Sequence, residues 1–375
     1  MTKIKIAIAI PTYNRLNKLK FALEKIEAQE LDSRFELYCV VSNIASKDGT
    51  VEFLDGLKSD KVKYVIWNKP EDNIYLNWRR CAESVPKDID WVWFHGDDDF
   101  LMHSQVIKGL VDVLELHSDE KLSLIHACQA RRSQKTGKLI RGNLFDICNQ
   151  LGYHEILGWM SSIVIRREKF VPAIIRATQL LADGLRPDDF LVHKYSSYRH
   201  SASFLEECIN DDALFIDMPW VEPQDIEQTQ ESIDRWAETH EGERYLFVVD
   251  DIINLYEKGV IKQKLSPVFF RYLTYSFWDR YAVFLLELTI NTGKISDRYK
   301  EHWLRVRKMA EFFDHERDKK IFIQWHSALN NHIAHYEKLN DEVIELQKNL
   351  IDQYKFTNSS IYPFQILAPD GSLII

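Results

Sequence analysis

The sequence has few features of a secreted, membrane-spanning or nucleic-acid-binding protein. Its five cysteines are an odd number with no C-x-x-C spacing, which favours buried thiols in a reducing compartment over a disulfide framework. No apolar run is long enough to span a bilayer. The first apolar run, Ile4 to Ile10, ends in a turn and is not typical of a signal peptide. The net charge of −9, without a basic stripe, argues against nucleic acid as the main partner.

The most apolar stretch runs from Pro267 to Ile290, but Arg271, Asp279 and Arg280 interrupt it. We therefore predict a buried helix there, with interfacial membrane contact as the alternative. Without a spanning segment we expect a cytoplasmic protein, with peripheral contact with the inner membrane as the alternative.

The first half of the chain alternates strands and helices. The 375 residues are 45% hydrophobic, enough for a sizeable core and for two domains or one large domain with an appendage. Apolar runs and helical spacings predict four strand–helix repeats, which indicate a parallel, doubly wound sheet. The predicted strands are Lys3 to Ile10, Phe35 to Val41, Val62 to Trp67 and Trp91 to His95. Further strands are predicted at Leu122 to Cys128, Ser161 to Arg166 and Ala213 to Met218, and a helix at Ile147 to Leu157.

A change of pattern near Pro223 and Gln224 divides the chain into residues 1–223 and 224–375. The second part is predicted to be mainly helical. Its leucine and valine spacing between residues 339 and 350 covers about two heptads, which favours a packed helix over self-association.

Polar side chains follow each of the first four predicted strands. They are Pro11-Thr12-Tyr13-Asn14, Ser42-Asn43, Asn68 and Asp97-Asp98-Asp99. Because ligands bind at the carboxyl ends of the strands in such sheets, these clusters predict one site.

The three consecutive aspartates are the sharpest feature. Carboxylates held this close repel one another unless a cation lies among them, and hard oxygen ligands suit Mg²⁺ or Mn²⁺. The triplet therefore indicates a site for a metal and a diphosphate. The alternative is an acidic loop in which Asp99 caps a helix that begins near His103.

Four segments in this order, PTYNR, VVSNIASKDGT, NKPEDNIYLN and WFHGDDDFL, resemble glycosyltransferase family 2. The resemblance covers about residues 3 to 220 and is strongest for bacterial enzymes that build surface polysaccharides such as O-antigen. It implies a GT-A fold, a nucleotide-diphosphate sugar donor, Mn²⁺ or Mg²⁺, and inversion at the anomeric carbon. The implied partners are the nucleotide sugar and a glycan or lipid-linked glycan acceptor.

The resemblance also implies donor-site roles. Pro11, Thr12 and Tyr13 match the loop that lines the base and ribose, and Arg15 matches a basic residue that approaches the diphosphate. Asn43 stands where the family usually has a base-contacting aspartate, so the base can be uracil, cytosine or thymine. A simple turn residue is the alternative for Asn43.

Asn73 and Asn77 match the asparagines that precede the metal-binding strand. Asp97 and Asp99 match the ends of the D-x-D motif. Both are assigned as metal ligands, Asp99 being the better one and Asp97 a contact of the ribose or the metal. Asp98 between them is also assigned to the donor site.

The catalytic base of the family matches Asp189, in a pair with Asp188. Such a carboxylate removes the proton of the acceptor hydroxyl, and a neighbouring carboxylate raises its proton affinity. Capping of the helix after Pro187 is the alternative. Trp159 and Met160 match the acceptor region, where an aromatic ring can stack on a sugar or pack in the core.

Three other functions compete with sugar transfer. A nucleotidylyltransferase would carry a Gly-rich basic loop after the first strand, which PTYNRLNK is not. A non-catalytic nucleotide-sugar-binding scaffold is the main alternative, favoured by Asn43 and opposed by the acidic motifs. Hydrolysis of a nucleotide sugar is the third.

Overall fold

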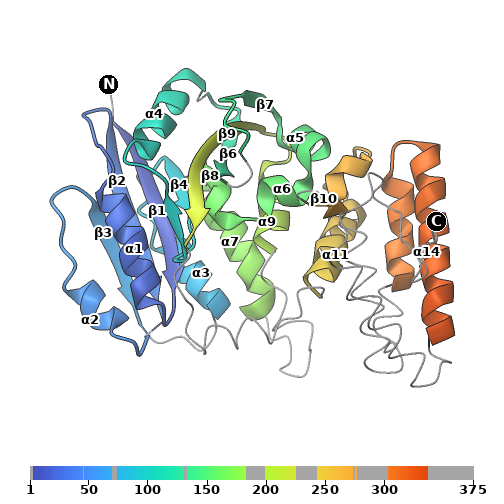
Figure 1. Ribbon diagram of the computed structural model, residues 1–375, viewed down its shortest axis with the longest axis horizontal. Helices are drawn as coiled ribbons and strands as arrows, with labels where there is room; N and C mark the ends of the chain where they lie inside the picture. Colours follow the sequence, from blue (N-terminus) through green and yellow to red (C-terminus); the bar gives the residue numbers. More distant parts are fainter. Residues whose placement is uncertain are drawn as a thin grey trace. The chain divides into compact units, whose positions relative to one another are not determined.

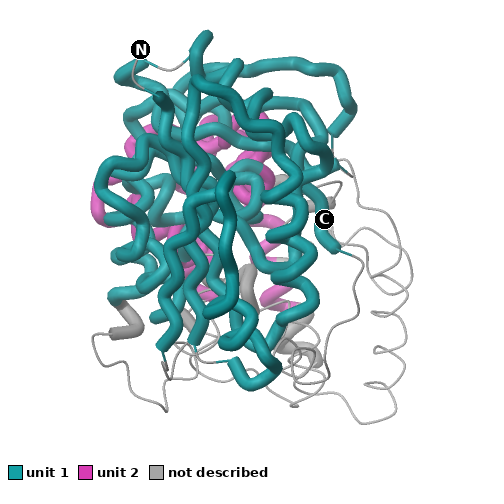
Figure 2. Tube along the Cα trace, turned by 90° about the vertical axis from the view of Figure 1, so that its left-hand side faces the viewer, with its two compact units in different colours: residues 1–147, 156–238 teal, residues 148–155, 239–375 magenta. Residues whose placement is uncertain are grey.

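The computed structural model describes residues 3–44, 46–69, 74–117, 119–130, 133–182, 199–224, 243–272, 275–276 and 303–336. The chain forms two compact units, coloured separately in Figure 2. The first unit is Met1–Ile147 with Ile156–Glu238, and the second is Cys148–Glu155 with Thr239–Ile375. The predicted division at residue 223 stays a prediction, and each unit is described here by itself.

Among the described residues, nine strands of the first unit form one sheet in the order β3-β2-β1-β4-β8-β6-β9-β5, with β7 paired to β9 (Figure 1). The strands are β1 (Ile4–Thr12), β2 (Phe35–Asn43), β3 (Lys63–Asn68), β4 (Trp91–Phe94), β5 (Asp99–Leu101), β6 (Leu122–Gln129), β7 (Leu139–Asn143), β8 (Ile163–Arg166) and β9 (Asp212–Pro223). Strands β1 to β4, β6 and β9 run in one direction, and β5, β7 and β8 run in the other. The prediction of a mostly parallel sheet is confirmed.

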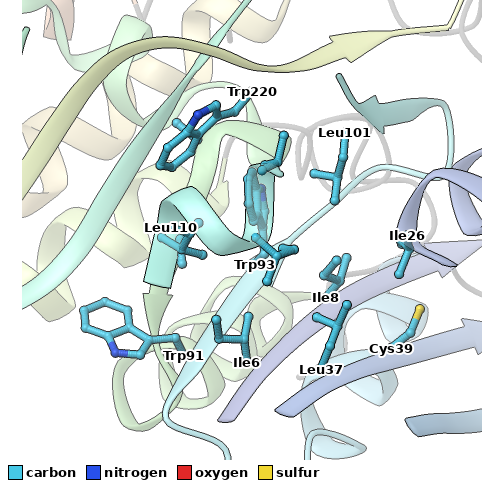
Figure 3. Packing of buried hydrophobic residues seen from close by; sticks show 14 of the residues in the cluster. Ile6, Ile8, Ile26, Leu37, Cys39, Trp91, Trp93, Leu101, Leu110 and Trp220 are labelled. Carbon is cyan, nitrogen blue, oxygen red and sulfur yellow. The ribbon is translucent and has the colours of Figure 1, made fainter. Parts of the chain in front are cut away.

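Helices cover both faces of this sheet. They are α1 (Leu16–Glu27), α2 (Thr50–Asp55), α3 (Ile74–Glu83), α4 (Val106–His117), α5 (Leu144–Leu151), α6 (Tyr153–Leu157), α7 (Arg167–Ala182) and α9 (Arg199–Cys208), with a 3-10 turn η1 (Met160–Ser162). Side chains of α1 and α4 pack with Trp93 and Trp220 in one apolar cluster, shown in Figure 3. The next residue of β4, Phe94, packs on the opposite side against Trp78 of α3 and Phe170 of α7. The alternation of side chains along β4 therefore anchors both helical layers.

Burial of both faces explains why the central strands are apolar throughout. Ile6, Ile8 and Ile10 of β1 lie in the cluster of Figure 3, and Ala7 and Ala9 between them are also fully buried. Such strands are typical of sheets covered on both sides.

The strand predicted at Ser161 to Arg166 is present as β8, Ile163–Arg166, and it runs antiparallel between β4 and β6. Its direction was not predicted, because apolarity indicates a strand but not its direction. Two expectations need correction. The helix expected at Ile147 to Leu157 is two helices, α5 and α6, which Gly152 separates with φ 112°. Asp99 begins β5 and α4 begins at Val106, so Asp99 does not cap a helix.

The second unit contains α11 (Glu243–Glu257), η3 (Pro267–Phe270), β10 (Arg271–Tyr272), β11 (Tyr275–Ser276), η4 (Arg307–Phe312) and α14 (Glu316–Tyr336). The helix predicted from Pro267 is therefore wrong for its described part, which is a 3-10 turn and an antiparallel strand pair. The rest of that stretch and the leucine spacing at 339–350 lie outside the described residues. Within the described residues, no helix combines the length and apolarity needed to cross a bilayer.

Aromatic packing forms the core of the second unit. Trp303 stacks on His326 at 4.0 Å between ring centroids and meets Trp325 edge-on at 5.5 Å. Arg305 donates to Asn254 and Glu257 of α11 at 2.7 and 2.8 Å.

Candidate active site

The acidic triplet lies where the chain leaves β4 and turns back into β5. Asp97 and Asp99 are each 4% exposed. Asp99 pairs with Pro223 of the antiparallel strand β9, so the turn lies between two strands of the sheet. Gly96 has no room for a side chain, because a Cβ there would lie 2.7 Å from Asp99 Oδ2 and 2.9 Å from Asp98 Oδ1. In the GDDD sequence, the carboxylates of Asp98 and Asp99 therefore pack against the backbone of Gly96, where there is no side chain.

Asp97 is held by Thr12, the last residue of β1, and by Arg15 in the loop after it. Thr12 Oγ1 donates to Asp97 Oδ2 at 2.7 Å, and Arg15 Nη1 donates to Asp97 Oδ1 at 2.9 Å. Arg15 also bonds Asp98 Oδ2 at 3.0 Å. Burial alone would lower the pKa of Arg15, but Asp97 and Asp98 outweigh it and raise that pKa. Burial likewise raises the pKa of Asp97, against the effect of Arg15. The β1 loop is thus tied to the acidic turn by charge.

Asp99 is held by Ser161 of the 3-10 turn η1, which directly precedes β8. Ser161 Oγ donates to Asp99 Oδ2 and accepts the backbone N–H of Gly96 at 2.8 Å. The Ser161 carbonyl accepts the indole N–H of Trp93 at 2.8 Å. Burial, followed by the charge of Asp98, raises the pKa of Asp99 well above its usual range. A nearby cation would relieve this crowding of carboxylates.

Gln224, at the end of β9, holds the backbone of the same turn. Its Nε2 lies within hydrogen-bond distance of the carbonyl oxygens of Lys18, Asp97 and Asp99, at 3.0, 3.2 and 3.3 Å. Its backbone N–H donates to the Asp98 carbonyl at 2.8 Å. One residue therefore fixes the carbonyls of all three aspartates.

Asparagines join the ends of the first three strands. Asn77 of α3 donates to the Thr12 carbonyl at 3.0 Å and accepts from Ser42 Oγ at 2.5 Å. Asn43 donates through Nδ2 to Asn68 Oδ1 at 2.8 Å. Because parallel strands end at one edge, these polar groups and the acidic turn share the carboxyl edge of the sheet.

Residues 7–170 match the protein family described as Glycosyl transferase family 2. This range contains the whole acidic turn and the ends of β1 to β4. Over these residues the chain is similar to the family 2 glycosyltransferases.

A similar protein is the abequosyltransferase RfbV of Salmonella typhimurium, 27% identical over 128 residues. That similarity spans 34% of this chain and 36% of the relative, about a third of each. The similarity between the two proteins is therefore confined to one segment of each chain.

Among solved structures, TarS 1-349 of S. aureus in complex with UDP-GlcNAc has a TM-score of 0.53 and 12% identity, over 99% of this chain and 96% of that one. TarS 1-349 in complex with UDP has a TM-score of 0.52 over the same shares. At this identity the likeness shows the fold alone, and it confirms the GT-A expectation.

Several other predicted residues of the family 2 domain lie at the same edge. Pro11 is buried in β1 and pairs in register with Ser42, and Tyr13 is half-buried after the strand. Trp159 is half-buried against the apolar cluster, and Met160 begins the 3-10 turn that carries Ser161. Their roles stay predictions. Asn73, Asp188 and Asp189 lie outside the described residues.

The acidic turn suits a hard divalent cation, although in the described residues no three His, Cys, Asp or Glu side chains are grouped as a metal site. Mg²⁺ commonly uses one or two carboxylates and takes its other ligands from water and substrate phosphates. Both oxygens of Asp97 already accept hydrogen bonds. Asp98 Oδ1 and Asp99 Oδ1 have no hydrogen-bond partner among the described residues, and carboxylate oxygens are the ligands such a cation takes.

Sequence reasoning did not identify Ser161 or Gln224 as site residues. Ser161 was expected to begin a strand, and Gln224 to mark a boundary. No local pattern indicates their contacts, because Ser161 lies 62 residues and Gln224 125 residues from Asp99 along the chain.

Proposed function

We propose that this protein is a metal-dependent, inverting glycosyltransferase that moves a sugar from a nucleotide-diphosphate donor to an acceptor hydroxyl, in the synthesis of a bacterial surface polysaccharide. The family 2 domain and its similarity to an abequosyltransferase support transfer of a sugar. The fold shared with TarS 1-349 in complex with UDP-GlcNAc supports a nucleotide-sugar donor.

The observation that carries the proposal is the acidic turn itself. Asp97, Asp98 and Asp99 are held by bonds from Thr12 at the end of β1, Ser161 of the turn η1 and Gln224 just after β9, at the edge where such sheets bind ligands. A turn of three carboxylates fixed in this way is prearranged for a cation and not for a neutral ligand.

Each group that holds the turn has a separate task. Thr12 and Arg15 orient Asp97, and Ser161 orients Asp99. In this proposal Asp97 and Asp99 would bind Mn²⁺ or Mg²⁺, with Asp98 between them as a further ligand. Such a cation would neutralise the diphosphate of the leaving nucleotide. Asp189, beside Asp188, would remove the proton of the acceptor hydroxyl as the anomeric carbon is attacked from the opposite side.

The acceptor is a glycan or lipid-linked glycan in this proposal. Trp159 and Met160, next to Ser161 in the sequence, would contact it. Residues 224–375 would form a separate helical region that shapes the acceptor site, contacts the membrane surface or mediates self-association. Cytoplasmic localisation, with peripheral contact with the inner membrane, belongs to the same proposal.

Calorimetric titration with CDP, UDP, GDP, ADP and dTDP, with and without Mn²⁺, tests the donor site. We expect Mn²⁺-dependent binding of at least one nucleotide that is lost in Asp99→Ala. Full sugar transfer by Asp189→Asn would rule out the assigned base, and absence of nucleotide binding to the wild type would favour a different function for the domain.

A further inference from the structure

Four residues at the ends of β1, β2 and β3 form a chain of hydrogen bonds, called here the asparagine relay: Asn14, Ser46, Asn43 and Asn68. The backbone N–H of Asn14 donates to Ser46 Oγ at 2.8 Å. Ser46 Oγ donates to Asn43 Oδ1. Asn43 Nδ2 then donates to Asn68 Oδ1 at 2.8 Å. The relay thus runs from the first strand loop to the third strand.

The direction of every bond in this relay is determined. A backbone N–H can only donate, so Ser46 Oγ accepts from Asn14 and directs its own hydrogen to Asn43. The backbone N–H of Ser46 also reaches Asn43 Oδ1, at 3.3 Å. Two donors therefore fix the oxygen of the Asn43 amide toward Ser46 and its nitrogen toward Asn68. An amide orientation follows from such a network and not from the shape of the side chain.

The end of the relay is the Asn68 amide. Its oxygen accepts from Asn43, and its Nδ2 has no partner among the described residues. Asn43 is fully buried, whereas Asn68 is half-buried as the last residue of β3. Of these two amides, Asn68 is the one that a ligand at the carboxyl edge would reach, and it would offer that ligand an N–H donor.

We propose that Asn68 selects the nucleobase of the donor, and that it prefers a base with a hydrogen-bond acceptor in the middle of its Watson–Crick edge. This inference rests on the proposed nucleotide-sugar function. Cytosine N3 and adenine N1 are such acceptors. Uracil, thymine and guanine have an N–H at that position, and two donors facing each other leave both without a partner in a desolvated site.

Calorimetric titration of the full chain with CDP, ADP, UDP, dTDP and GDP, each with Mn²⁺, measures the preference directly. We expect CDP or ADP to bind the wild type at least about tenfold more tightly than the other three, the effect of one satisfied against one unsatisfied bond. The CDP and ADP titrations show which of the two bases is taken. If UDP, dTDP or GDP binds as tightly as the better of these two, the inference is wrong.

Two variants test the relay itself. Asn43→Asp can only accept, so Asn68 must turn its Nδ2 inward and present its oxygen, and the preference should reverse toward UDP, dTDP or GDP. Asn68→Ala should bind all five nucleotides within about threefold of one another. Because Asn68 is partly exposed, this variant remains informative if Asn43→Asp does not fold.

Asn143→Asp is the matched control. Asn143 pairs with Asp212, the first residue of β9, and so lies at the opposite edge of the sheet. It should keep the wild-type preference. A preference that persists in Asn68→Ala would contradict the inference, and a wild type that binds none of the five nucleotides would overturn the proposed function as well.

Discussion

Replacing Ser161 with alanine should destabilise the first unit and weaken its cation site together. Ser161 is 0% exposed. Its hydroxyl donates to Asp99 and accepts from the Gly96 N–H, and alanine offers neither bond. Each buried group left without a partner costs about 1–3 kcal/mol, and two groups lose theirs, so we expect a loss of about 2–6 kcal/mol in the free energy of unfolding.

Ser162→Ala is the matched control. Ser162 is 1% exposed and lies in the same 3-10 turn, but its side chain has no hydrogen bond to the acidic turn. We expect it to lose less than about 1 kcal/mol. Urea denaturation followed by circular dichroism gives both values, and titration with Mn²⁺ and nucleotide gives the affinity.

The affinity for Mn²⁺ with nucleotide should fall only in Ser161→Ala, because Ser162 does not orient Asp99. Equal losses of stability in the two variants would show that burial of a small hydroxyl, and not its bonds to the turn, sets the effect. An unchanged Mn²⁺ affinity in Ser161→Ala would refute the orienting role.

Three further predictions concern other contacts of the first unit. Gly96→Ala should lower Mn²⁺-dependent nucleotide affinity at least about tenfold, since its Cβ would lie 2.7 Å from Asp99 Oδ2, while Gly56→Ala, with ordinary contacts at 3.5 Å, should not. Gln224→Glu should lose more than about 2 kcal/mol in urea denaturation, because a carboxylate would face three carbonyl oxygens without a proton to donate. A loss below about 0.5 kcal/mol would show that these bonds do not hold the turn. Burial alone would raise the pKa of Asp217, but bonds from Thr136 and Ser133 outweigh it and lower that pKa. Its stabilisation is then fully present above about pH 4 and declines as the pH falls from there through the lowered pKa of the folded state. Asp217→Asn should therefore cost about 1–3 kcal/mol at pH 7, and progressively less as the pH is lowered below about 4. A difference independent of pH would contradict this.

Local patterns predicted most of the parallel half of the sheet. The runs at Phe35 to Val41 and Val62 to Trp67 became β2 and β3 within two residues at each end. This succeeded for β2 because its residues are largely buried and therefore mostly apolar. The edge strand β3 is only half-buried, and its aromatic and β-branched residues made it visible in the sequence. The common direction of β1 to β4, which places the polar clusters at one edge, also followed from the repeated strand–helix units.

Patterns failed where partners far along the chain decide the conformation. The direction of β8 depends on its insertion between β4 and β6. The 3-10 turn and strand pair after Pro267 replace a helix that apolarity favoured. A short apolar run fits either structure, so its packing partners decide.

The sequence by itself determined that the acidic triplet and the polar residues after β1, β2 and β3 would meet, because the carboxyl ends of parallel strands share an edge. Only the tertiary structure decided how they are held. Ser161 and Gln224 contact the acidic turn although they lie 62 and 125 residues from Asp99 along the chain. The amide nitrogen of Asn43 points toward Asn68 because Ser46, which accepts from Asn14, donates to the Asn43 oxygen. Hydrogen-bond direction depends on the three-dimensional position of each donor and acceptor, which no spacing along the chain encodes.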